Sequence, residues 1–265
     1  MTELKFGWRK NPYNKKAWIH PLIPRVLPDV IDLSKWLPIE IRDQQAGDCV
    51  GMTISTYLAW WAKKLGVYSG LFSPTWIYNG ARYLEGSLRY DDGCYPDHAL
   101  KWLVEKGGLL EKFWPYKGFE TTSPPSSLDP EAAKWPVLVF YRITNGVDGI
   151  MDAMAQNYAV AIGTPWYEEW LNIGKDGKLP EVNSSSQIVG GHETLLHTYD
   201  RIRKLFGGRN SWGKAWADSG NYWMPYSAFI QFRYDGGYDA HYFKVEWVSV
   251  SPNPGWCKSK FSRWL

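Results

Sequence analysis

The hydrophobic pattern of this chain changes its period near the middle, and the change restricts the folds that are open to it. The first half has three stretches with helical spacing: about 49–64, a stretch that opens after Ser73-Pro74, and about 96–105. The second half has strand patterns at 137–141, 159–163, 192–199, 202–206 and 220–225, with one helix at about 149–156. A helical half followed by a mostly β half predicts an α+β fold with two lobes around a shared cleft.

A segment rich in proline and serine, 121–130, marks the crossing between the halves. We therefore expect a helical lobe over 30–125 and a β-rich lobe over 126–250. The segment 1–29 is rich in Pro, Lys and Arg, which favours an extended arm over a helix. The tail 251–265 has no periodic pattern.

The composition provides for a large core and excludes several classes of partner. Hydrophobic residues make up 45% of the 265, which is enough apolar surface to fold without a covalent staple. The formal charge is +3 with no long basic run, so no nucleic-acid partner is expected. The chain has neither a secretory signal nor a window close to the roughly 18 apolar residues of a membrane span. We expect no membrane partner and no secretion by a signal peptide.

Cysteine usage leaves thiols free for chemistry. The three cysteines, Cys49, Cys94 and Cys257, are an odd number without paired spacing, which argues against a disulfide framework and for a reducing compartment. Cys49 begins the first helical stretch, with Asp48 as the expected N-cap. A helix N-terminus stabilises a thiolate, so Cys49 is the candidate nucleophile.

The second half supplies the other two groups that a thiol nucleophile needs. His192 follows Gly190-Gly191 at the start of an expected strand, and Gly191 lets the backbone approach a substrate. Asn210 opens the turn Asn210-Ser211-Trp212-Gly213, where its amide can hold the imidazole in the productive tautomer and Trp212 can shield that bond. Each residue alone is more often structural, but the ordered set indicates a cysteine hydrolase.

Other motifs do not predict a site. His192 and His197 are five apart on one expected strand and would face opposite sides, so we expect no metal. The adjacent acids Asp91-Asp92 and Glu168-Glu169 are typical of a solvated surface. No cofactor is expected.

The chain resembles the papain-like cysteine peptidases over about residues 30–229. The segment Gly191-His192-Glu193-Thr194-Leu195-Leu196 and the block Arg209 to Tyr222 are similar to the family's histidine strand and its asparagine block. The segment Ile41 to Gly51 is similar to its glutamine-to-cysteine segment. Asp92-Gly93-Cys94-Tyr95-Pro96 is similar to its glycine wall.

This resemblance implies a papain-like fold with a helical left lobe, a barrel-like right lobe and an active site in the cleft between them. It implies hydrolysis of a polypeptide substrate through a thioester on Cys49, with His192 as the base and Asn210 as its orienter. Gln44 and the Cys49 N–H are implied to hold the oxyanion. The implied substrate-binding positions are Asp92, Gly93, Gly191 and Trp212.

The chain departs from the family pattern at several positions. Gln44 lies five residues before Cys49 where the family usually has six, which leaves Gln45 as a rival oxyanion donor. Other family residues are replaced by Ala46, Val50, Ala217 and Asn221. Because Ala46 stands at a cysteine position, the secreted-type disulfide is missing. With the short arm, this resembles bacterial and bacteriophage-encoded members.

Two other functions are also compatible with the sequence. One is a structural or binding component of a phage particle with weak or lost catalysis, whose arm and tail contact neighbouring protein subunits. The other is a murein peptidase or amidase that uses the same triad. The expected location is the cytoplasm of a bacterial host or an assembled virion. Restraint of the enzyme by a partner, by the arm lying across the cleft, or by nothing also remains open.

Overall fold

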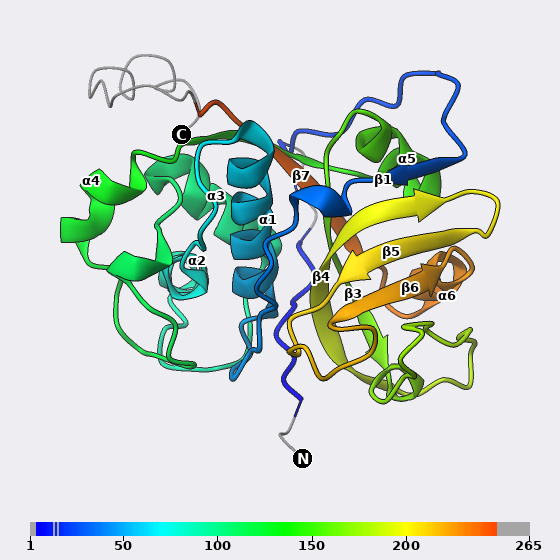
Figure 1. The fold of residues 1–265 in the computed structure, drawn as a ribbon. Coiled ribbons are helices and arrows are strands. Elements are labelled where there is room, and N and C mark those ends of the chain that lie inside the picture. The colour runs from blue at the N-terminus through cyan, green and yellow to red at the C-terminus, as the bar shows by residue number, and fades with distance from the viewer. Residues whose placement is uncertain (1–3, 13, 15, 248–265) are drawn as a thin grey trace.

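The computed structural model describes residues 4–12, 14 and 16–247, and these form two lobes (Figure 1). Helices α1 (Cys49–Leu65), α2 (Pro74–Glu85) and α3 (Pro96–Lys106) lie in one lobe, and most of the sheet lies in the other. The expected tail 251–265 and Cys257 lie outside the described residues. The α+β fold with a helical and a β-rich lobe is confirmed.

Residues next to α1 and α2 explain where these helices begin or end. The Ser73 hydroxyl accepts from the Trp76 N–H at 3.1 Å, and Pro74 occupies the first turn of α2. Gly66 and Gly86 end α1 and α2 at φ 68° and 70°, in the left-handed region that glycine adopts readily. These helices agree with the sequence prediction to within one or two residues.

Asp48 stands at the expected N-cap position of α1, but its side chain does not cap the helix. Its side chain makes no cap hydrogen bond to the first turn of α1. It is instead buried, and one carboxylate oxygen has no hydrogen-bond partner. Burial raises the pKa of Asp48 to about 7, against the hydrogen bond from Tyr116.

Within the described residues the strands form one antiparallel sheet in the order β2-β7-β3-β4-β5-β6, and β1 also pairs with β4. The strand bounds are β1 Val30–Asp32, β2 Val137–Arg142, β3 Val160–Tyr167, β4 Ile188–Asp200, β5 Leu205–Arg209, β6 Asn221–Pro225 and β7 Asp239–Val245. The smaller helices are α4 Asp129–Ala132, α5 Gly146–Ala155 and α6 Ala228–Tyr234, with 3-10 turns at Ser34–Trp36, Glu111–Phe113, Ser126–Leu128 and Glu168–Trp170.

Several details of the sheet differ from the expectation. Residues 201–204 form a turn, with Lys204 at φ 55°, so the strand expected at 202–206 begins only at Leu205 and includes Gly207-Gly208. The sequence pattern missed α6 and β7. Because β1 pairs with β4, residues 30–32 belong to the sheet and not to the helical lobe.

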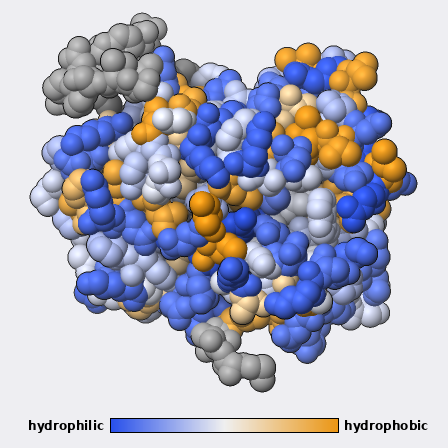
Figure 2. Space-filling view, in the orientation of Figure 1, coloured by the Kyte–Doolittle hydropathy of each residue, from blue (hydrophilic) through white to orange (hydrophobic). Residues whose placement is uncertain are grey.

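The tryptophans are largely core residues, and Trp60, Trp76, Trp166 and Trp170 are fully buried. The face in Figure 2 is mostly hydrophilic, with apolar patches. Exposed apolar side chains gather in the segment before β1, namely Leu22, Ile23 and Val26. Among the described residues, no helix has the length and apolar character needed to cross a membrane.

Replacing Ser73 by alanine is expected to lower the free energy of unfolding by about 1–2 kcal/mol, because α2 loses its cap. The Ser73 hydroxyl also donates to the Trp114 carbonyl at 2.7 Å, which places the effect at the upper end. Urea denaturation of the wild type and the variant measures the difference. Ser184→Ala, at an exposed position, is the control, and equal losses for both variants would contradict the capping role.

Candidate active site

The N-terminal end of α1 packs against β4, and this contact brings Cys49 to the sheet. Thr53, one helical turn after Cys49, donates its hydroxyl to the Glu193 carbonyl at 2.8 Å. The backbone at Glu193 and at Gly7 lies close enough to the Cys49 thiol to lower its pKa, against the larger effect of burial. The nucleophile candidate is therefore adjacent to the strand residue that follows His192.

His192 and Asn210 contact each other directly. The distance from His192 Nε2 to Asn210 Oδ1 is 2.7 Å, and the Ser211 N–H also donates to that Oδ1. Because Oδ1 is an acceptor, Nε2 carries the proton in the neutral ring, and Nδ1 is left as the basic nitrogen. Nδ1 is buried and has no hydrogen-bond partner, so its lone pair is available for a proton.

Two tryptophans enclose the imidazole. Trp212 stacks on His192 with ring centroids 4.5 Å apart, and Trp166 meets it edge-on at 4.9 Å. Both indoles are buried. They keep water from the bond between His192 and Asn210, which strengthens that bond and fixes the ring.

Of the two candidate glutamines, Gln44 lies in the site. Its Oε1 accepts from the Ser211 hydroxyl at 2.5 Å, which orients the amide, and its Nε2 donates to the carbonyls of Lys5 and Ala46 at 2.9 and 3.1 Å. Gln45 is exposed, and its Nε2 donates to the Asp43 carbonyl. Of the two glutamines, Gln44 is the one whose amide donates to a backbone carbonyl of the N-terminal arm.

The N-terminal arm runs between the lobes, where Figure 1 shows it as a dark blue segment. The N–H groups of Gly7 and Trp8 both donate to the Gly191 carbonyl at 3.0 Å. On the helical side, the Cys94 N–H donates to the Gly7 carbonyl at 3.0 Å, and the Arg9 N–H donates to the Cys94 carbonyl at 3.2 Å. The arm binds as an added extended segment, in the manner of a bound peptide.

The expected substrate-binding positions differ in their contacts. Gly191 pairs with the arm, and Trp212 meets the Phe6 ring edge-on at 5.8 Å. Gly93 approaches the arm, but its N–H lies 3.2 Å from the Tyr78 hydroxyl, so the backbone pairing falls to Cys94 instead. Asp92 is exposed. The sequence did not predict that Cys94 pairs with the arm, because the pairing uses its backbone and not its thiol.

With the arm in place, the catalytic candidates are held neutral. Burial raises the pKa of the Cys49 thiol, the Glu193 charge adds to this, and hydrogen bonds from the backbone at Glu193 and Gly7 oppose it. Burial lowers the pKa of His192 to about 4, against the hydrogen bond with Asn210. The closed site therefore contains a thiol and a neutral imidazole at pH 7.

Known proteins are similar to this chain in sequence and in overall structure. No family model matches the chain. An uncharacterized peptidase C1-like protein of Acanthamoeba polyphaga mimivirus is 25% identical over 221 residues, which cover 77% of this chain and 71% of that protein.

Solved structures are similar over nearly the whole chain. Xylellain, a cysteine protease from Xylella fastidiosa, has a TM-score of 0.83 at 22% identity, covering 91% of this chain and 96% of its own. Procathepsin B S9 of Trypanosoma congolense has a TM-score of 0.72 at 13% identity, covering 92% and 87%. Bromelain from Ananas comosus, solved with the E64 inhibitor, has 0.65 at 16%, covering 83% and 100%. The resemblance to the papain-like cysteine proteases is confirmed, and the chain has their fold.

Metal ligation finds no support in the part of the chain that the structure describes. No group of three or more His, Cys, Asp and Glu side chains there could hold an ion.

Replacing Gly7 by alanine is expected to raise the rate at which iodoacetamide alkylates Cys49 at pH 7 by at least about tenfold. The added Cβ would stand 1.7 Å from the Gly47 carbonyl oxygen, so the arm cannot keep its position. Water then reaches the site, the thiol pKa falls and the imidazole pKa rises, because burial is the largest cause of both shifts. Mass spectrometry of the Cys49 peptide measures the rate.

Gly174→Ala is the matched control, since Gly174 lies on an exposed loop and an added Cβ would meet only the Asp176 carboxylate, at 3.3 Å. An unchanged rate in Gly7→Ala would show that the arm does not protect the thiol.

Proposed function

We propose that this chain is a papain-like cysteine peptidase that hydrolyses peptide bonds of a polypeptide substrate through Cys49, His192 and Asn210. The observation that carries the proposal is the state of His192. Its Nε2 is bound to Asn210 Oδ1, while its buried Nδ1 has no partner and the strand that carries it lies against the thiol. This is the arrangement that a general base for a cysteine nucleophile requires.

The proposed reaction has two halves. The Cys49 proton passes to His192 Nδ1, and the sulfur attacks the carbonyl carbon to form a tetrahedral intermediate. The Gln44 amide and the Cys49 N–H stabilise its oxyanion. His192 then protonates the leaving amine, which leaves a thioester, and in the second half His192 takes a proton from the water that cleaves this thioester to an acid.

The arm supports this assignment of the oxyanion donor. The Lys5 carbonyl already accepts from Gln44 Nε2 at 2.9 Å, so that amide is aimed at a peptide carbonyl. A substrate would have to displace residues 5–9 to reach the same position. We therefore propose that the arm is the restraint on the enzyme.

The rival functions differ in measurable ways. A structural component of a virion would carry a Cys49 that stays unreactive after the arm is displaced. A murein peptidase or amidase would clear a suspension of cell walls but leave an unstructured protein such as casein intact. We propose the peptidase because a protected but oriented His192 has a use in catalysis and none in a purely structural role.

Replacing Gln44 by alanine in the Gly7→Ala background is expected to lower kcat on an unstructured peptide about 10²–10³-fold, because one oxyanion donor is lost. Gln45→Ala in the same background is the control and should change kcat little, since its side chain lies outside the site. Steady-state hydrolysis of a fluorogenic peptide measures both. Equal losses for the two variants would contradict the role of Gln44.

Cys49→Ser in the Gly7→Ala background is expected to abolish hydrolysis, and acid quenching of the parent during turnover is expected to trap an acyl group on Cys49 that mass spectrometry detects. Hydrolysis that survives Cys49→Ser would overturn the proposed function.

A further inference from the structure

The segment that leads into the nucleophile, residues 44–48, lies outside the helices and strands. We call it the Gln44 loop. No disulfide fixes it, because Ala46 stands at a cysteine position of the family and the two described cysteines, Cys49 and Cys94, are free. The shape of the Gln44 loop therefore depends on acceptors that other segments supply to its backbone.

Three such acceptors hold the backbone of the Gln44 loop. The Gln44 N–H donates to the Ser211 carbonyl at 2.8 Å, the Gln45 N–H to the Tyr116 hydroxyl at 2.7 Å, and the Gly47 N–H to the two Asp91 carboxylate oxygens at 2.9 and 3.1 Å. The carboxylate is the charged acceptor among them, and hydrogen bonds to charged groups are the stronger ones. A Cβ on Gly47 would lie 3.1 Å from both the carbonyl oxygen and Oδ1 of Asp91, so the loop rests directly on this residue.

The same carboxylate is joined to the segment that pairs with an extended peptide. The Tyr78 hydroxyl donates to Asp91 Oδ1 at 2.9 Å and accepts from the Gly93 N–H at 3.2 Å. Burial raises the pKa of Tyr78, so its hydroxyl keeps the proton that it donates. Gly93 is followed by Cys94, whose backbone pairs with the arm. One chain of hydrogen bonds therefore runs from Gly47 through Asp91 and Tyr78 to Gly93.

A second carboxyl group lies beside this chain of hydrogen bonds. Burial raises the pKa of Asp48 to about 7, the hydrogen bond from Tyr116 opposes this shift, and the charge of Asp91 adds to it. The buried Arg82 guanidinium, 4.0 Å from the centre of the Tyr78 ring, acts on Asp48 in the opposite direction. Below neutral pH Asp48 carries a proton, and the Asp91 carboxylate remains the acceptor for Gly47 and Tyr78.

We propose that Asp91 is a positioning residue of the peptidase, which holds the Gln44 loop in register with the backbone at Cys94. This inference rests on the proposed function, in which the Gln44 amide and the Cys49 N–H stabilise the oxyanion. Asp91 acts through Gly47 and touches neither group. Adjacent acids are typical of a solvated surface, and Asp91 and Asp92 are both exposed, but the hydrogen bonds of the Asp91 carboxylate give it this further role.

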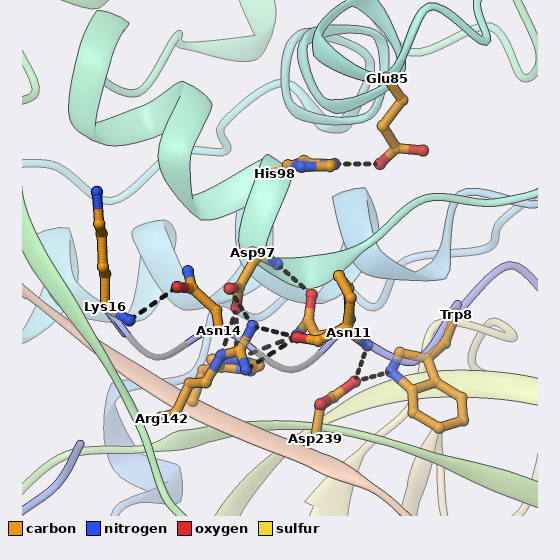
Figure 3. A network of polar contacts seen from close by, with 11 residues as sticks. Trp8, Asn11, Asn14, Lys16, Glu85, Asp97, His98, Arg142 and Asp239 are labelled. Carbon is orange, nitrogen blue, oxygen red and sulfur yellow. Dashed lines mark hydrogen bonds and ion pairs between the residues drawn. The ribbon is translucent and has the colours of Figure 1, made fainter. Parts of the chain in front are cut away.

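The arm has anchors that do not involve Asp91. The Trp8 indole and the Asn11 N–H donate to Asp239 at 3.1 and 2.8 Å, and Asn11 Oδ1 accepts from the Asp97 N–H at 3.0 Å (Figure 3). A substitution at Asp91 leaves these contacts in place. Its effect on the Gln44 loop can therefore be measured with the arm still in the site.

The first test needs no catalysis and uses the full chain. Asp91→Ala is expected to speed amide hydrogen exchange at Gly47 at least about tenfold, because this N–H loses its acceptor. Asp176→Ala is the matched control, since exposed Asp176 also accepts from a backbone N–H, that of Lys178 at 3.2 Å. Exchange followed by NMR measures both variants. Equal exchange rates at Gly47 in the two variants would overturn the proposal.

The second test measures peptide hydrolysis in the Gly7→Ala background. Asp91→Ala is expected to lower kcat at least about tenfold with little change in KM, because the oxyanion exists only in the transition state. Asp176→Ala should change neither constant. A loss confined to KM, or a kcat equal to that of the control, would overturn the positioning role.

Asp91→Asn provides a conservative variant and carries both tests if Asp91→Ala does not fold. Its amide oxygen still accepts from Gly47 but has no charge. We expect faster exchange at Gly47 and a lower kcat, each with a smaller change than in Asp91→Ala. A kcat of Asp91→Asn below that of Asp91→Ala would contradict the role of the acceptor.

The two tests separate this inference from the proposed function. Faster exchange at Gly47 together with an unchanged kcat overturns the positioning role and keeps the peptidase. A Gly7→Ala chain that cleaves no peptide overturns the proposed function and with it the catalytic purpose of Asp91. Faster exchange at Gly47 would then still show that Asp91 holds the Gln44 loop.

Discussion

The contact between the start of α1 and the middle of β4 is the constraint on which the rest of the site depends. The hydrogen bond from Thr53 to the Glu193 carbonyl fixes the rotation of the helix relative to the strand, since Cys49 and Thr53 share one helical face. With that rotation set, the thiol meets the backbone of the residue that follows His192. More than half of the chain separates these two residues, so the mechanism depends on how the lobes pack and on no local motif.

The N-terminal arm covers the site formed at this contact. It offers the carbonyl of Lys5 to Gln44, the backbone of Gly7 to both lobes and the indole of Trp8 to Asp239. Arg9 and Asn11 secure its far end, through Glu85 at 3.0 Å and through Asp239 at 2.8 Å. These are contacts that a substrate peptide would make. Burial is the largest cause of the pKa shifts of the thiol and the imidazole, so under the proposed function displacement of the arm would also activate the site.

Local chemistry made the helices predictable, and the ordered set of Cys49, His192 and Asn210 indicated the catalytic candidates. Ser73-Pro74 and the glycines after α1 and α2 are signals that act within a few residues, and the structure follows them. Asp48 is a residue type that commonly caps helices, but its side chain is buried and hydrogen-bonded to Tyr116 instead. This contact comes from tertiary packing and cannot be predicted from the neighbouring sequence. The pairing of β1 with β4 could not be predicted either, because a strand of three residues is too short to show an alternating hydrophobic pattern. The choice between Gln44 and Gln45 depended on Ser211, which lies far along the chain and orients only one of them.

Glu193 and Asp239 show how much of the site depends on strand register. In the sequence, Glu193 is the residue after a histidine, and Asp239 stands where no strand was expected. Only the register of β4, β3 and β7 places them beside one another. Burial and the charge of Asp239 raise the pKa of Glu193 above its value in the unfolded chain, so this group lowers the free energy of unfolding as pH rises above its unfolded pKa.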